Sequence, residues 1–255
     1  MNSIYLKLFI YKLKMLYVYR KDFFIGILSS IIKALIGIIF IESIFNNVTT
    51  INGWNQSKLV YLYFSVSYMQ AIYHMLFMGM IGFSDLYIKN GELDCVLIKP
   101  VNPLKYIIAY DISIKEMPAV IINLLVLIVT IKKLTNNTLD MALLILLPHC
   151  GMLIMLWFSI FINCLSFRYY DTLMGVKFIV AITDFCRYPM NIYPKFISYI
   201  ATFIVPYGLV TFYPLKDVTK LKSYFYMVLA LVVCLGFIAY RVWERSLNNY
   251  QSVGS

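Results

Sequence analysis

The sequence has few charged residues: Asp, Glu, Lys and Arg make up 13% of its 255 residues, about half of their share in soluble domains. Hydrophobic residues account for 62%, and several apolar runs approach the roughly 20 residues that a helix needs to cross a bilayer. We therefore expect an all-α integral membrane protein, with one transmembrane domain over residues 1–255. Basic residues at a membrane surface then explain the net charge of +10, and no nucleic-acid partner is expected.

Motifs of catalysis are also missing from the sequence. There is no G-x-x-x-x-G-K-[ST] phosphate-binding loop, so we expect no ATP hydrolysis by this chain. The H-E-x-x-H and G-x-S-x-G motifs are absent as well. The five cysteines and two histidines are scattered, which predicts neither a disulfide framework nor a metal site. We expect no catalytic residue and no cofactor bound by this chain.

The apolar runs predict six transmembrane helices, at about residues 23–45, 59–83, 117–131, 141–167, 170–185 and 224–241. The fifth is short and is interrupted by charged residues. Before the last span, Pro206 and Gly208 lie near the middle of an uncharged run. They favour a re-entrant outer hairpin within 187–215 over another crossing.

Lysine and arginine are more frequent in the N-terminal segment, the central loop, the turn after the fourth span and the C-terminal end than in the other connections. This bias places both termini in the cytoplasm. A composition rich in Lys, Ile, Asn and Tyr indicates an AT-rich bacterial genome. We therefore expect a multi-pass protein of a bacterial plasma membrane.

A polar, turn-rich segment at 84–105 separates the second and third spans. Asn-Gly and Asn-Pro dipeptides bracket Glu92 to Ile98, which has Leu93, Val96 and Leu97 at helical spacing. This pattern predicts a short amphipathic helix at the edge of the membrane, where another protein can hold it. An ordinary solvated loop is the alternative, because loops are commonly charged.

The N-terminal residues 1–22 mix basic and apolar side chains. Lys7, Lys14 and Lys21 recur every seven residues and so fall on one helical face. We expect an interfacial helix that lies along the cytoplasmic surface. A basic tail before the first span is the alternative. Because lysines interrupt the apolar runs, no cleavable signal peptide is expected.

A lysine, Lys33, lies inside the first predicted span, where a charge is costly and often functional. Glu42 follows nine residues later, on the opposite helical face, so the two are not expected to pair. Lys33 therefore needs a cavity or an acidic partner. It is a candidate for the substrate path, where it would counter an acidic group on the cargo.

Aromatic residues and prolines gather in the predicted hairpin. They suggest an outer gate for an apolar or amphipathic substrate, or an aromatic belt that only anchors the protein. The candidate gate residues are Arg187, Tyr188, Pro189, Tyr193 and Pro206.

The order and spacing of several short motifs resemble a known family. They are Gly53-Trp54, Gly91-Glu92-Leu93-Asp94 with Leu97 and Pro100, Arg187-Tyr188-Pro189, Tyr193-Pro194, Val205-Pro206 and Tyr250-Gln251-Ser252. Together with the predicted spans, they resemble the permease subunits of bacterial type-2 ABC exporters, in the branch of ABC-2 family transporter proteins. The resemblance covers nearly the whole chain.

The resemblance implies a cytoplasmic ATP-binding subunit that carries ATP and magnesium. The residues expected to couple to it are Gly91, Glu92, Leu93, Asp94, Val96 and Leu97, as a coupling helix, and the lysines of the N-terminal helix. A second permease, identical or a sister protein, would complete the path. The implied cargo is a drug, an antimicrobial peptide or a lipid-like molecule.

Two other functions stay open at this stage. One is a stand-alone membrane protein that confers immunity or forms a channel without ATP. The other is a secondary transporter, although the halves of the sequence show no convincing inverted repeat. Disruption of Glu92 to Ile98 distinguishes the exporter from the stand-alone protein, because only an ATP-coupled exporter depends on that helix.

Overall fold

The computed structural model describes residues 2–18, 20–46 and 48–251. Within these ranges the chain folds into helices and connecting turns. The only strand-like feature in them is an isolated bridge between Ile51 and Trp54. The prediction of an all-α protein is therefore confirmed.

Five helices in the described ranges are long and apolar enough to cross a membrane, and a bent helix pair makes a sixth if it counts as one span. The five are α2 (Arg20–Phe45), α3 (Gln56–Ile81) with its continuation Ser84–Lys89, α6 (Met117–Leu134), α7 (Thr138–Tyr169) and α11 (Leu221–Asn248). These elements support a multi-pass membrane protein.

The predicted fifth span differs from the structure. Its residues form α8, Leu173–Phe185, which has only 13 residues and extends about 20 Å, less than the bilayer core of about 30 Å. The apolar run predicted too long a helix, because Tyr170 and Asp171 belong to the turn that ends α7. The prediction of six spans is thus confirmed only as five to six.

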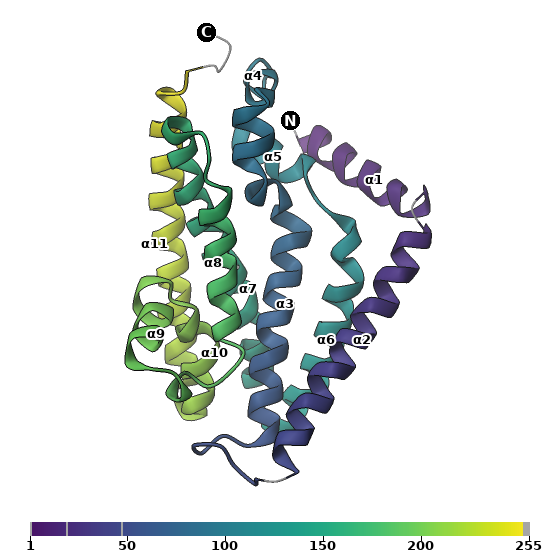
Figure 1. Ribbon diagram of the computed structural model, residues 1–255, viewed down its shortest axis with the longest axis vertical. Coiled ribbons are helices and arrows are strands. Elements are labelled where there is room, and N and C mark those ends of the chain that lie inside the picture. The colour runs from purple at the N-terminus through teal and green to yellow at the C-terminus, as the bar shows by residue number, and fades with distance from the viewer. Residues whose placement is uncertain (1, 19, 47, 252–255) are drawn as a thin grey trace.

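The long helices stand side by side (Figure 1). α3 occupies the middle and contacts α6, α7 and α8, while α11 packs along α7. α2 lies at the side and leans on α6 and α3. In the most apolar 18-residue segment of each helix, 17% of the residues are buried in α2 and 56% in α3. α2 is therefore the least embedded of these helices together with α11.

The two ends of the molecule differ in content (Figure 1). Both chain termini lie at one end, with α1 (Asn2–Val18), α4 (Glu92–Leu97) and α5 (Pro103–Tyr110). We call it the α4 end. The opposite end, the α10 end, holds the loop after α2 together with α9 (Lys195–Tyr199) and α10 (Tyr207–Lys216).

Local sequence signals explain several helix boundaries. The side chains of Asn55, Asn102 and Asn137 each accept a hydrogen bond from a backbone N–H in the first turn of α3, α5 and α7, as N-cap residues do. Gly91 adopts φ +72° and turns the chain from Ser84–Lys89 into α4. Glycine accepts this left-handed conformation without the steric cost of a Cβ atom.

The core follows the contact between α3 and α7. Its buried polar groups pair across the two helices: the Tyr61 hydroxyl donates to the Leu144 carbonyl at 2.7 Å, and the Asn163 amide donates to the Met80 carbonyl at 2.6 Å. Such internal pairing is required where lipid offers no hydrogen-bond partner. α3 and α7 therefore form the stable part on which the other helices rest.

The predicted hairpin region contains a sharp break. The helical segments Lys195–Ile204 and Tyr207–Lys216 meet at 108°. The break falls at Val205 and Pro206, the position that the proline predicted. That this pair re-enters a membrane from one side, rather than crossing it, stays a prediction.

Candidate functional site

α4 is fixed to the protein by two of its apolar residues. Leu93 and Val96 are buried, at 0% and 3% exposure, whereas Leu97 and Ile98 are 39% and 84% exposed. Leu97 and Ile98 are adjacent, so the end of α4 presents a small apolar surface. Of the residues predicted to couple, Leu93 and Val96 thus attach α4, while exposed Glu92 and Leu97 face outward.

Two motifs that are far apart in the sequence meet at α4. The Asp94 carboxylate lies near the hydroxyl of Tyr250, and burial, followed by this carboxylate, raises the pKa of Tyr250. The Tyr250 ring packs edge-on against Phe167, with 5.7 Å between ring centroids. The Gly91–Asp94 motif and Tyr250 of the C-terminal motif therefore lie together, while Ser252, which ends that motif, is outside the described residues.

The chain before α4 is joined to its neighbours by polar contacts. The Lys89 ammonium lies 2.7 Å from Asp85 and 2.8 Å from Asp171, which precedes α8. The Tyr87 hydroxyl donates to the Asp111 carboxylate at 2.7 Å. Burial raises the pKa of this carboxyl. These bonds connect the continuation of α3 with α8 and with the segment that leads into α6.

α1 contacts the same region. It packs on α5 and on the short helix Ile114–Glu116, and the Lys12 ammonium lies 5.3 Å from the centroid of the Tyr110 ring. Lys7 and Lys14 are exposed on α1, but Lys21 lies in the first turn of α2. The single helix predicted over residues 1–22 is therefore wrong at its end, because α1 ends at Val18.

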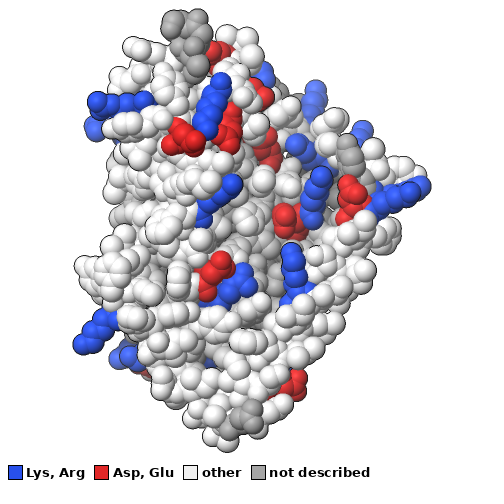
Figure 2. Space-filling view, in the orientation of Figure 1, with Lys and Arg blue, Asp and Glu red and all other residues white. Residues whose placement is uncertain are grey.

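A polar groove opens in the middle of the molecule, between α2 and α3. Its cavity measures about 430 Å³ and is bounded by α2, α3, the start of α6 and Arg187. We call it the α2 groove. Figure 2 shows charged side chains continuing from the α4 end into the middle of this face, between α8 and α2. The polar residues that line it are Ser29, Ser30, Lys33, Ser67, Gln70, His74, Lys115, Glu116, Asn123 and Arg187.

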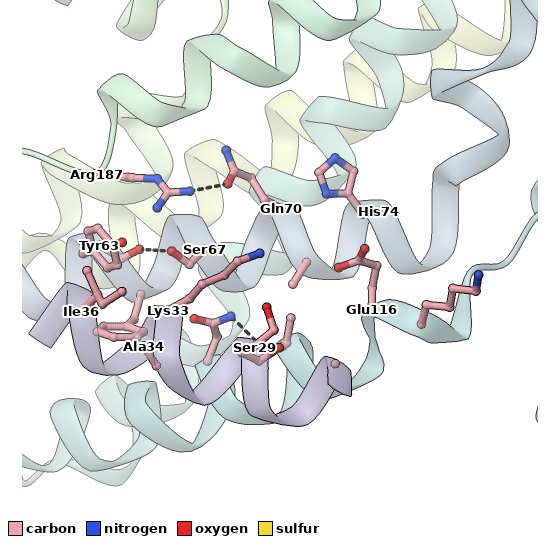
Figure 3. A pocket seen from close by; sticks show the side chains of 17 residues that line it. Ser29, Lys33, Ala34, Ile36, Tyr63, Ser67, Gln70, His74, Glu116 and Arg187 are labelled. Atoms are coloured by element: carbon pink, nitrogen blue, oxygen red, sulfur yellow. Dashed lines mark hydrogen bonds between the residues drawn. The ribbon is translucent and has the colours of Figure 1, made fainter. Parts of the chain in front are cut away.

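Arg187 is fastened to α3 at the wall of the α2 groove (Figure 3). Its Nη2 donates to Gln70 Oε1 at 2.7 Å, and its Nε donates to Asp184 Oδ1 at 3.0 Å. Gln70 Nε2 donates to the same Asp184 oxygen at 2.9 Å. The guanidinium also lies 5.0 Å from the centroid of the Tyr63 ring. This network ties the end of α8 to α3.

Lys33 points into the same groove from α2 (Figure 3). The sequence placed Lys33 and Arg187 in separate elements, and the structure brings them to one cavity. Gln70 and Glu116 also line it, and sequence reasoning missed them. The charge of Glu116 just before an apolar run could have marked it as a candidate site residue. Gln70, a neutral polar residue inside a span, gave a weaker indication.

The remaining predicted gate residues are not gathered in the α2 groove. Tyr193 packs edge-on against Phe185 and lines a separate cavity at the α10 end. Burial raises the pKa of Tyr193 to about 12. Pro189 is buried, Tyr188 is half-buried, and Pro206 is buried at the break before α10. The five predicted residues therefore occupy at least two places.

No metal centre is found in the part of the chain that the structure describes, because no three His, Cys, Asp or Glu side chains are grouped there. A family model described as ABC-2 family transporter protein matches residues 8–254. No curated protein matches the chain, and no solved structure matches it. The matched residues include both α4 and the α2 groove.

Proposed function

The chain belongs to the ABC-2 family of transporter proteins, and from this membership we propose the transport step that it performs. It is the transmembrane permease of an ABC transporter, and its ATPase is a separate partner. The proposed reaction is the ATP-driven export of an apolar or amphipathic molecule, such as a drug, an antimicrobial peptide or a lipid-like compound. ATP and magnesium are bound by the partner.

The observation that carries this proposal is the continuity between α4 and the groove wall. α4 is attached through Leu93 and Val96, and the segment before it continues α3, which is kinked at Phe77, as the helical stretch Gln56–Lys89. Gln70 in that stretch lines the α2 groove. A movement of α4 by the ATPase would therefore be passed to a wall of the substrate path through the helical turns between Gln70 and Lys89, which the Tyr87–Asp111 hydrogen bond also joins to the segment before α6.

The partner surface is proposed to be the outward side of α4, with Glu92, Leu97 and Ile98, together with the exposed lysines of α1. These elements lie at the same end of the molecule. In this arrangement the α4 end is cytoplasmic, as are both termini, and the protein resides in a bacterial plasma membrane. The segment before α10 then forms the outer gate.

A second permease is proposed to complete the path, as a homodimer or as a pair with a sister protein. One side of the α2 groove is open to the molecular surface. A path that a single chain leaves open on one side needs a second wall if cargo is to be kept from the surrounding lipid.

Co-purification tests the proposal. The tagged chain is purified from its host in mild detergent, and the accompanying proteins are identified by mass spectrometry. We expect an ATPase with a phosphate-binding loop, and we expect Leu97→Asp with Ile98→Asp to remove it. Ile192→Asp is the matched control, since Ile192 is 45% exposed and lies in the segment before α9, away from α4.

A chain that purifies without any ATPase, yet still protects cells against a toxin, would contradict the proposal. It would favour the stand-alone immunity protein instead. Leu93→Asp is unsuited to this test, because a charge at a fully buried position would displace α4 from the protein.

A further inference from the structure

The lining of the α2 groove is unbalanced in charge. Three basic side chains, Lys33, Lys115 and Arg187, face one carboxylate, Glu116. Asp184 compensates Arg187 through a 3.0 Å ion pair. Among the described residues, no such pair is formed by Lys33. Lys33 therefore presents a positive charge to whatever enters the groove.

The neutral polar groups near Lys33 do not supply the missing negative charge. Ser67 donates to the Tyr63 carbonyl at 2.9 Å, and Asn123 donates to the Ala119 carbonyl at 2.7 Å. Each side chain donates within its own helix, and neither carries a negative charge. Lys33 lies near the middle of α2, at a depth where an unpaired charge is costly. Glu116 lines the same groove, but among the described residues it forms no ion pair with Lys33, so the ammonium is left for an entering anion.

The surroundings of the groove are apolar. On α2, Ile32, Leu35 and Ile36 are 47%, 50% and 61% exposed beside Lys33. Further along the same three helices, α2, α3 and α6, a second cavity of about 360 Å³ is lined mainly by apolar residues such as Ile38 and Val60. An anion that carries an apolar chain can keep that chain against these residues while its charge reaches Lys33.

We infer that the α2 groove binds amphipathic molecules that carry one anionic headgroup, a carboxylate or a phosphate, with Lys33 as the counter-ion. Arg187 adds N–H donors to the same headgroup, since Gln70 and Asp184 use only part of its five. This inference rests on the proposed function, because it names the class of cargo, or of resident lipid, that the path holds.

Binding to the purified chain tests the inference without the ATPase or nucleotide. Dodecyl phosphate is titrated into the protein in dodecyl maltoside, and binding is measured by equilibrium dialysis. Dodecylphosphocholine is the matched probe, with the same chain and a neutralised headgroup. We expect the phosphate to bind at least about tenfold more tightly than the phosphocholine, as charge-assisted hydrogen bonds to one headgroup require.

The variants separate charge from folding. We expect Lys33→Met to weaken dodecyl phosphate binding about tenfold and Lys33→Arg to preserve it. Lys222→Met removes an exposed lysine at the start of α11 and should leave binding unchanged. Unchanged size-exclusion profiles show that each variant is folded. Equal binding by Lys33→Met and wild type would overturn the inference, as would equal binding of the two probes.

Two further arms identify the natural source of the anion. In phosphatidylcholine nanodiscs, added phosphatidylglycerol that displaces dodecyl phosphate identifies a membrane lipid as the occupant. Failure to displace it identifies a separate amphipathic cargo. If dodecyl phosphate binding does not depend on Lys33 but the ATPase still co-purifies, only this inference is wrong. If Lys33-dependent binding is found but no ATPase co-purifies, only the proposed function is wrong.

Discussion

The Tyr87 hydroxyl donates a 2.7 Å hydrogen bond to the Asp111 carboxylate, and this bond joins the end of the α3 helical stretch to the segment that leads into α6. Asp111 also lies directly against Gly79 of α3. The Asp111 carboxylate therefore contacts this helical stretch at two positions. The contact lies at the α4 end of α3 and α6, which both bound the α2 groove.

Tyr87→Phe removes the donor and leaves a half-buried carboxylate less well satisfied. We expect a loss of about 1.5–3 kcal/mol of stability, the range for hydrogen bonds to charged groups. The measurement is thermal unfolding in detergent. Tyr226→Phe is the control, because Tyr226 is 68% exposed. Equal effects of the two substitutions would show that the bond contributes nothing.

Gly79→Ala should destabilise the same joint. A Cβ atom at residue 79 would occupy the space of the Asp111 carboxylate, and overpacking of this kind typically costs about 1–3 kcal/mol. Asp111→Ala in the same chain should relieve the clash, so the double variant should be more stable than additivity allows. Gly26→Ala is the matched control, since its nearest contact would be an ordinary 3.5 Å.

The stability of the protein should depend on pH through Asp111. Burial raises the pKa of this carboxyl above its usual 3.8, and this effect exceeds the opposing hydrogen bond from Tyr87. The folded protein therefore holds the proton more tightly than the unfolded chain. The free energy of unfolding then falls as pH rises from the usual pKa through the raised one.

Asp111→Asn removes this titration, so its melting temperature should fall less than that of the wild type between about pH 4 and about pH 7. The amide can still accept the bond from Tyr87. If the melting temperatures of the two proteins changed equally with pH, another group would dominate the pH dependence.

Gly91→Ala should disturb α4 through backbone conformation alone. No atom lies within 4 Å of the place of the new Cβ, but φ is +72°. A left-handed alanine costs about 1–2 kcal/mol. We expect weaker co-purification of the ATPase with Gly91→Ala and a smaller loss with Gly91→Asn, because asparagine tolerates this conformation. Similar losses for both variants would assign the effect to the side chain.

Composition and apolar run length were enough to predict the class of fold. The short helix at Glu92 was also visible, since Gly91 and the spacing of Leu93 and Val96 act within a few residues. The length of α8 was not, because Tyr170 is apolar enough to extend the run although it belongs to a turn.

The α2 groove was predictable only in part. Lys33 stood out because a charge inside a span needs compensation. Its companions did not, because Gln70 and Arg187 are joined across 117 positions of sequence, and such pairing depends on how α8 packs on α3. Neither hydropathy nor spacing contains that information.

The Tyr63 ring occupies the space that a Cβ atom on residue 37 would need, so Gly37 marks a close approach of α2 to α3. Elsewhere α2 leans on α6, and most of its apolar surface is exposed. The width of the groove should then respond to bilayer thickness, since an exposed apolar helix tilts to match it. Identical protein in thin and thick membranes would then hold the same ligand with different affinity.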